Sequence, residues 1–209
     1  MAVDIKDVEC NRCLRVLNTI LERWTEANIE LARLWCQDGD VPWWYNERAN
    51  LSVLAGAIWR AGGLVFEEFL EEKRKITKTG KLSMHYRGRV DLYFCFSGYQ
   101  FIAESKRIES GILKDSEPVG VIQRSLNMAC RDIRKVRPFK QRRLGITFAL
   151  PYLRKGQFKS ADERIARWLR ETQSVDCDAR AWVFPGISRA ICDKEFVCPG
   201  VAVFMKEIG

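Results

Sequence analysis

Hydrophobic positions recur at two different spacings along this chain, and the spacing separates predicted helices from predicted strands. Apolar residues at the helical period predict helices over about 8–36, 46–61, 121–136 and 161–172. Short apolar runs bounded by turn residues predict strands over 64–76, 88–96, 99–107, 144–150, 181–184 and 201–205. The first helical segment fits one long helix or two helices that break near 25–28, and Pro151 is expected to close the strand before it.

The chain offers one clear place for a division, at Asp38-Gly39-Asp40, which stops the first helical segment. No internal repeat, low-complexity tract or Ser/Gly-rich linker occurs elsewhere. We therefore predict a helical N-terminal extension over 1–40 and a single domain over 41–209, and 209 residues suffice for one core with such an extension. The extension could serve as an accessory layer, a dimer element or part of the core.

Composition narrows the class of protein. A hydrophobic content of 47% favours a globular fold, and a net charge of +8 with a pI of about 9.2 suits a polyanionic partner. No apolar run reaches the length of a membrane span, and the acidic residues within 1–7 do not fit a secretion signal, so we expect a cytoplasmic protein. Only Cys10 and Cys13 form a close pair among eight cysteines, which favours reduced thiols over a zinc site.

Charged residues interrupt two neighbouring apolar runs that Ser97-Gly98 separates. Asp91 lies in the first run, while Glu104 and Lys106 are two positions apart in the second and so share one face of a strand. A hairpin through Gly98 would bring two carboxylates and one ammonium to one edge of a sheet. Carboxylate oxygens are the ligands that Mg²⁺ prefers, and a bound metal together with a lysine can stabilise a phosphoryl transition state. A solvated face of an open sheet is the alternative interpretation of the same residues.

Asp91 followed by Glu104-Ser105-Lys106 resembles the PD-(D/E)XK nuclease superfamily. The Gly-x-Val-Asp lead-in that ends at Asp91 is a frequent form of its first half, although Val90 stands where the nominal proline would be. The resemblance covers about 45–150, in which helix, strand, hairpin, helix and strand follow in the expected order. It implies a restriction-endonuclease-like fold: α/β, with a central mixed β-sheet flanked by helices.

The resemblance also implies roles for individual residues. Asp91, Glu104, Glu47 and the main-chain carbonyl of Ser105 would bind Mg²⁺ or Mn²⁺, and Lys106 would orient the attacking water or stabilise the developing charge. Glu47 matches the acidic residue that many members carry on the preceding helix, but a carboxylate in a first helical turn also has an electrostatic reason to be there. Gln123 on the following helix would position water or phosphate.

A basic surface and an aromatic cluster add two candidate contacts with nucleic acid. The aromatic cluster Trp43-Trp44-Tyr45 could stack on bases or could cap the hydrophobic core, and we favour the core. The basic residues on and after the helix at 121–136 could contact phosphates or could form an ordinary solvated face. The candidate nucleic-acid-binding residues are Arg124, Arg131, Arg134, Lys135, Arg137 and Lys140.

These features together predict a Mg²⁺-dependent nuclease that hydrolyses DNA phosphodiester bonds. RNA stays open as a substrate, and a homodimer is compatible with the sequence. One alternative is a non-catalytic nucleic-acid-binding or assembly module that retains the nuclease fold. The other is a basic adaptor whose Trp-containing N-terminal helix binds another protein.

Overall fold

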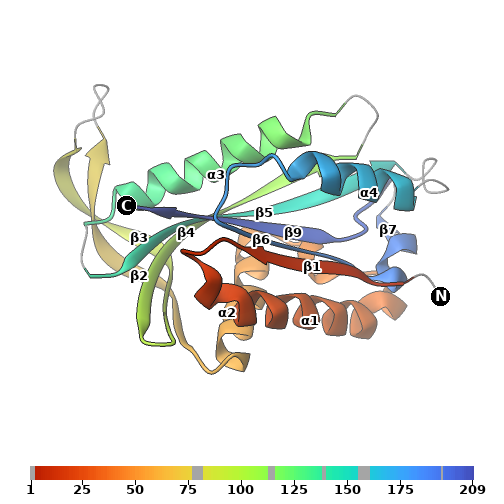
Figure 1. The fold of residues 1–209 in the computed structure, drawn as a ribbon, viewed down its shortest axis with the longest axis horizontal. Coiled ribbons are helices and arrows are strands. Elements are labelled where there is room, and N and C mark those ends of the chain that lie inside the picture. Colours follow the sequence, from red (N-terminus) through yellow and green to blue (C-terminus); the bar gives the residue numbers. More distant parts are fainter. Residues whose placement is uncertain (1–2, 77–81, 113–115, 138–139, 155–160, 194) are drawn as a thin grey trace.

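The computed structural model describes residues 3–76, 82–112, 116–137, 140–154, 161–193 and 195–209. In these ranges, nine strands form a sheet whose main path is β1-β6-β9-β5-β4-β3-β2, with β7 and β8 off that path. Helices cover both faces, as Figure 1 shows: α3 and α4 lie over one face, and α1 and α2 lie over the other. The predicted α/β class with a mixed sheet flanked by helices is therefore confirmed.

The middle of the chain follows the predicted order of elements. It comprises α2 (Glu47–Arg60), β2 (Leu64–Ile76), β3 (Leu82–Phe96), β4 (Tyr99–Gly111), α3 (Pro118–Arg134) and β5 (Arg142–Arg154). Strands β2, β3 and β4 are antiparallel neighbours, whereas β4 and β5 run parallel. A parallel pair requires a crossover connection, and α3 supplies it.

The turn between β3 and β4 has two residues, as the sequence predicted. Ser97 and Gly98 both have positive φ angles, of 49° and 80°, and Phe96 pairs with Tyr99 directly across the turn. This backbone twist matches the twist of the flanking strands, which is why such turns favour glycine. The register of the hairpin is thereby fixed at its closed end.

The remaining elements extend the sheet on its other side. They are β1 (Ile5–Cys10), α1 (Asn18–Trp35), α4 (Ala161–Thr172), β6 (Ala179–Phe184), β7 (Cys192–Asp193), β8 (Phe196–Val197) and β9 (Val201–Ile208). The described part of the chain also contains the short 3-10 helices η1 (Arg15–Leu17), η2 (Cys36–Asp38), η3 (Pro42–Trp44) and η5 (Gly186–Ala190). None of the helices in the described ranges is long and apolar enough to cross a membrane.

Side chains alternate along β5 between two hydrophobic layers. Phe148 packs into the layer beneath α1 and α2, and the adjacent Ala149 packs into the layer beneath α3 and α4. Trp24 of α1 and Trp168 of α4 are each 1% exposed and anchor one layer apiece. The central strand β5 is therefore buried on both faces, whereas side chains of the edge strand β2, such as Phe66 and Leu70, are exposed.

The N-terminal segment departs from its predicted structure. The helical prediction from residue 8 is wrong at its start, because Ile5–Cys10 forms a strand that pairs antiparallel with β6. The open edge of β6 satisfies the backbone hydrogen bonds of these residues, which a local pattern does not reveal. Helix α1 then runs without a break through 25–28. Leu14 and Leu21 are buried in the hydrophobic layer between the sheet and helices α1 and α2.

Strand β5 continues past Pro151, contrary to the prediction that this proline ends it. Pro151 lies opposite Ser110 of β4, and β5 ends only at Arg154. Pairing with β9 stops at Ala149, and pairing with β8 begins at Leu153. Pro151 thus falls in the gap between two partner strands, where the missing backbone N–H costs no ladder hydrogen bond.

Candidate active site

Asp91 lies where β3 separates from β4. Pairing between these strands ends at Leu92 and Ala103, whereas β3 stays paired with β2 beyond that point. The Asp91 carboxylate fills the opening, since its Oδ2 accepts hydrogen bonds from the backbone N of Ser105 at 2.7 Å and from Ser105 Oγ at 3.1 Å. The structure therefore places Asp91 directly beside Glu104-Ser105-Lys106.

Glu47 reaches the same place from the first turn of α2. The Asn46 side chain caps this helix by accepting from the backbone N of Ala49 at 3.0 Å. Glu47 Oε1 accepts from Ser105 Oγ at 3.2 Å, and its Oε2 accepts from the backbone N of Arg107 at 3.1 Å. Burial raises the pKa of Glu47, Lys106 opposes the rise, and Asp91 adds to it.

Glu104 is buried and paired with a lysine. Its Oε1 lies 2.5 Å from Nζ of Lys73, which comes from the outer half of β2. That half of β2 is bound to the end of α3, because the backbone N of Arg74 donates to the carbonyl of Lys135 at 2.7 Å. Burial and the charge of Asp91 raise the pKa of Glu104 to about 7, although the Lys73 ammonium opposes the rise.

Lys106 projects toward the C-terminal end of α3. Its Nζ donates to the carbonyl of Ser105 at 2.7 Å and lies 3.1 Å from Asp132 Oδ2. Burial disfavours the charged amine, but Asp132, Glu47 and Asp91 outweigh burial and raise the pKa of Lys106. Lys106 is therefore a firmly protonated ammonium, suited to stabilise negative charge and unsuited to take up a proton.

Together, Glu47, Asp91, Glu104, Ser105 and Lys106 form what we name the acidic cluster. Among the described residues, no three acidic, histidine or cysteine side chains form a group arranged to hold a metal ion. The donor set still fits Mg²⁺ chemically, because it offers hard carboxylate and carbonyl oxygens. Asp91 Oδ1 and Glu104 Oε2 have no hydrogen-bond donor in the described part of the chain, so each carboxylate keeps one free oxygen.

Two lysine contacts would have to change before all the candidate ligand oxygens could bind one ion. Lys73 holds Glu104 Oε1, and Lys106 holds the carbonyl of Ser105. Both contacts are made by flexible lysine side chains and not by backbone. The residues therefore fit a divalent cation in their chemistry, while their arrangement requires two lysines to move.

Gln123 is not brought to the acidic cluster. Its side chain donates to Asn127 at 3.2 Å and accepts from the backbone N of Asp176 at 2.8 Å. Asp132, which contacts Lys106, lies nine residues further along α3, about 13 Å along a helix axis. The C-terminal end of α3 packs against the acidic cluster, so a residue near its N-terminal end is held away from it.

The predicted basic surface divides into two groups. Lys135 lies 2.6 Å from Asp132, and Arg137 lies 3.4 Å from Glu72, so both take part in internal ion pairs. The other members are exposed at the surface; they are Arg124, Arg131, Arg134 and Lys140. These four remain the better candidates for phosphate contacts.

The aromatic cluster is divided in the same way. Trp43 is fully buried and donates from Nε1 to the carbonyl of Cys198 at 3.0 Å, so the favoured core interpretation holds for it. Tyr45 is 49% exposed, and Trp44 is half-buried. Only the last two residues of the cluster could meet a ligand.

Three residues that contact the acidic cluster were not predicted. They are Lys73, Asp132 and Arg107. Asp132 is the one acid within the basic segment 131–143, and Lys73 begins a run of three basic residues inside a strand, which are the only sequence signals for either.

Comparison with models of protein families, with curated proteins and with solved structures finds no match.

Proposed function

We propose that this protein is a metal-dependent nuclease that hydrolyses DNA phosphodiester bonds, with a restriction-endonuclease-like fold. One observation carries the proposal: Asp91 and Glu47 both accept hydrogen bonds from Ser105, at the point where β3 separates from β4. Three carboxylates and an ammonium thus lie around the middle of β4, where its pairing with β3 ends. The order α2, β2, β3, β4, α3 and β5 also agrees with the fold that the resemblance implies.

Asp91, Glu104, Glu47 and the Ser105 carbonyl would hold Mg²⁺ or Mn²⁺. The ion would supply Lewis-acid polarisation of the phosphoryl group and a more acidic water. Ser105 keeps Asp91 and Glu47 in register with each other, because its backbone N donates to Asp91 and its hydroxyl group lies within hydrogen-bond distance of both carboxylates. Ser105 therefore fixes the directions in which these two carboxylates point.

Lys106 supplies the fixed positive charge in this proposal. Its ammonium lies next to the carbonyl of Ser105 and its side chain is 24% exposed, so a phosphate bound beside the acidic cluster can reach it. Negative charge that develops on the phosphoryl oxygens would be stabilised by an ammonium already held in position. Asp132 positions Lys106 from α3 and is itself balanced by Lys135.

The substrate proposal follows from charge. A net charge of +8 and the exposed Arg124, Arg131 and Arg134 on α3 suit a polyanion. The end of this helix packs against the acidic cluster, so a strand bound along α3 would pass close to Lys106. Backbone phosphates are shared by DNA and RNA, and DNA is the substrate that the resemblance favours.

Incubation of the protein with plasmid, linear and single-stranded DNA in Mg²⁺ or Mn²⁺ tests the proposal. We expect cleavage that EDTA abolishes and that Lys106→Ala reduces at least a hundredfold, as loss of a charge-stabilising group does. Lys6→Ala removes the same charge from an exposed site on β1 and should leave cleavage unchanged. Absence of cleavage of all three substrates by the unaltered protein would refute the proposal.

A non-catalytic nucleic-acid-binding module is the second candidate. The observation in its favour is that, in the described residues, no three-ligand metal group is ready formed. Calorimetric titration with Mg²⁺ separates the two. Binding that Asp91→Asn removes supports the nuclease, whereas DNA binding without any binding of Mg²⁺ or Mn²⁺ supports the module.

A further inference from the structure

A small aromatic cavity opens beside the acidic cluster. It has a volume of ≈ 200 Å³ and is lined by Trp44, Arg107, Glu109, Tyr152, Phe196 and Cys198. The rings of Tyr152 and Phe196 meet edge to face, with centroids 5.5 Å apart. Pockets for drug-sized ligands span about 300–1,000 Å³, so this cavity suits a single planar ring system.

Arg107 joins this cavity to the acidic cluster. Its backbone N donates to Glu47 Oε2 at 3.1 Å, while its guanidinium donates to the carbonyl of Trp44 at 3.1 Å. Arg107 is also the next residue after Lys106, and Trp44 precedes Glu47 by three positions. Two residues span about 7 Å of a strand, so the cavity lies within one nucleotide of Ser105.

The rim of the cavity carries a hydrogen-bond acceptor. Arg107 donates to Glu109 Oε1 at 3.2 Å, and Glu109 is 61% exposed. No donor in the described residues reaches Glu109 Oε2. A carboxylate at such a site accepts from the exocyclic amino group of cytosine, which thymine lacks.

We propose that this cavity binds one unstacked nucleobase of the strand that is cleaved, and that Glu109 favours a base with an exocyclic amino group. The proposal rests on the proposed nuclease function. Aromatic side chains provide the face on which such a base packs, and Arg107 offsets the negative charge that Glu109 would otherwise present to a phosphate. The occupant is a base of an unpaired or locally opened strand, because a base within a duplex cannot leave its stack without cost.

Binding of fluorescein-labelled dC10 and dT10, measured by anisotropy in EDTA, tests the cavity apart from any cleavage. Phe196→Ala should weaken binding of dC10 roughly tenfold, the usual loss when one stacking aromatic is removed. Trp59→Ala removes an exposed aromatic from α2, outside the cavity, and should change nothing. Glu109→Ala, which removes the acceptor at an exposed position, should abolish the preference for dC10 over dT10 and leave the fold intact.

The outcomes separate this inference from the proposed function, because cleavage is assayed independently on the same proteins with Mg²⁺ and Mn²⁺. Cleavage by the unaltered protein, with dC10 binding unchanged in both Phe196→Ala and Glu109→Ala, would overturn the cavity inference alone. Weakened binding in Phe196→Ala without cleavage by the unaltered protein would support a base-binding cavity and refute the nuclease. Failure of the unaltered protein to bind either oligonucleotide would overturn the inference.

Discussion

Lys73 Nζ lies 2.5 Å from Glu104 Oε1, and the two side chains are only 10% and 6% exposed. They come from β2 and β4, which are separated in the sheet by β3. They meet because β3 leaves β4 at Asp91 and because the outer half of β2 is bound to the end of α3. A candidate metal ligand is thus neutralised by a lysine of the same chain.

This ion pair predicts a strong effect of Lys73→Met on stability. Removing one partner of a buried pair leaves the other charge uncompensated, which costs about 3–5 kcal/mol. We expect the free energy of unfolding in urea to fall by that amount at pH 8. The loss should be much smaller at pH 5, where Glu104 can stay protonated. Lys73→Met combined with Glu104→Gln should recover most of the loss, and an additive double variant would contradict direct pairing.

Glu104 also predicts how stability depends on pH. Its pKa of about 7 in the folded chain exceeds that of an unfolded glutamate, so the folded state retains the proton over a range in which the unfolded state has released it. This contribution is complete below about pH 4 and is lost as the pH rises to 7. Relative to Glu104→Gln, the unaltered protein should lose up to about 3 kcal/mol between pH 4 and pH 8. If the free energy of unfolding changed with pH equally in the two proteins over this range, Glu104 would ionise normally.

Divalent-metal binding should depend on the carboxylates that meet Ser105. Because a ligand that binds only the folded state raises its stability, 10 mM Mg²⁺ or Mn²⁺ should increase the melting temperature of the unaltered protein. Asp91→Asn and Glu47→Gln should each reduce this increase strongly. Asp7→Asn, on an exposed residue of β1, is the matched control and should preserve it. An increase that persists in both site variants would place the ion elsewhere.

The exposed arginines of α3 should govern the salt dependence of DNA binding. Replacing Arg124, Arg131 and Arg134 together by Gln should weaken the salt dependence of duplex binding. The slope of log K against log salt should become less negative by about 2.7, if each arginine contacts one phosphate. The measurement is duplex binding in EDTA at several salt concentrations.

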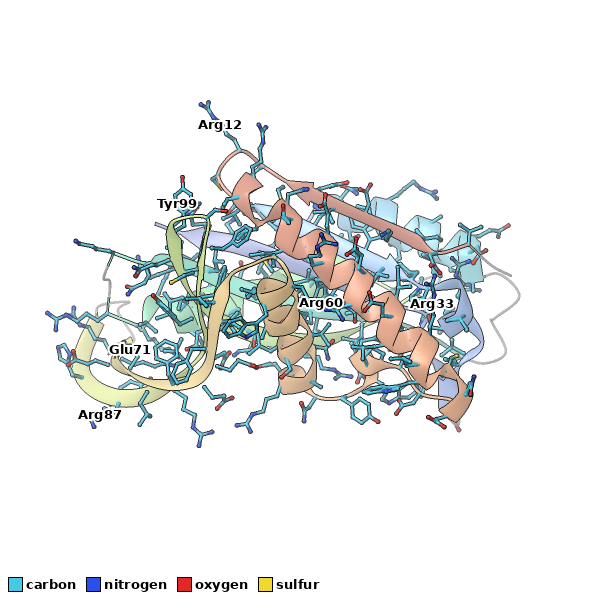
Figure 2. All side chains as sticks on the ribbon, turned by 90° about the horizontal axis from the view of Figure 1, so that it is seen from below. Arg12, Arg33, Arg60, Glu71, Arg87 and Tyr99 are labelled. Carbon is cyan, nitrogen blue, oxygen red and sulfur yellow. The ribbon has the colours of Figure 1, made fainter. Side chains whose placement is uncertain are left out.

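The matched control removes the same charge from the α1 and α2 layer, where Figure 2 shows Arg33 and Arg60. Its three substitutions are Arg23→Gln, Arg33→Gln and Arg60→Gln. Equal loss of slope in both triple variants would indicate a general charge effect, with no particular role for α3.

Helix α3 packs so closely against β5 that there is no room for a side chain at Gly145. A Cβ there would lie 2.8 Å from the backbone N of Cys130 and 2.5 Å from its Sγ, so α3 would have to move away from β5. We expect Gly145→Ala to lower the free energy of unfolding by about 1–3 kcal/mol. Gly56→Ala meets no atom within 4 Å and, inside a helix, should stabilise by up to about 1 kcal/mol. Equal stability of the two variants would refute the close approach of α3.

Local sequence patterns were sufficient for most elements of the fold. Helix α4 begins and ends at the predicted residues, and α2 begins directly after its Asn46 cap. The Ser97-Gly98 turn fixed the β3–β4 hairpin, and alternation along β4 put Glu104 and Lys106 on one face. These features depend on residues a few positions apart, and backbone geometry alone relates such residues.

Only the tertiary structure decided the contacts that distinguish this site. Strand β1 pairs with β6 although the partner residues are 169 to 179 positions apart, and Lys73 reaches Glu104 only because the outer half of β2 is bound to the end of α3. Gln123 and Asp132 lie on the same helix, yet only Asp132 meets the acidic cluster. Periodicity specifies which face of an element is buried, but not where along its length another element crosses it. That crossing point is set by the packing of the whole sheet, and it determined which charged residues gather in the middle of β4, where β3 separates from it.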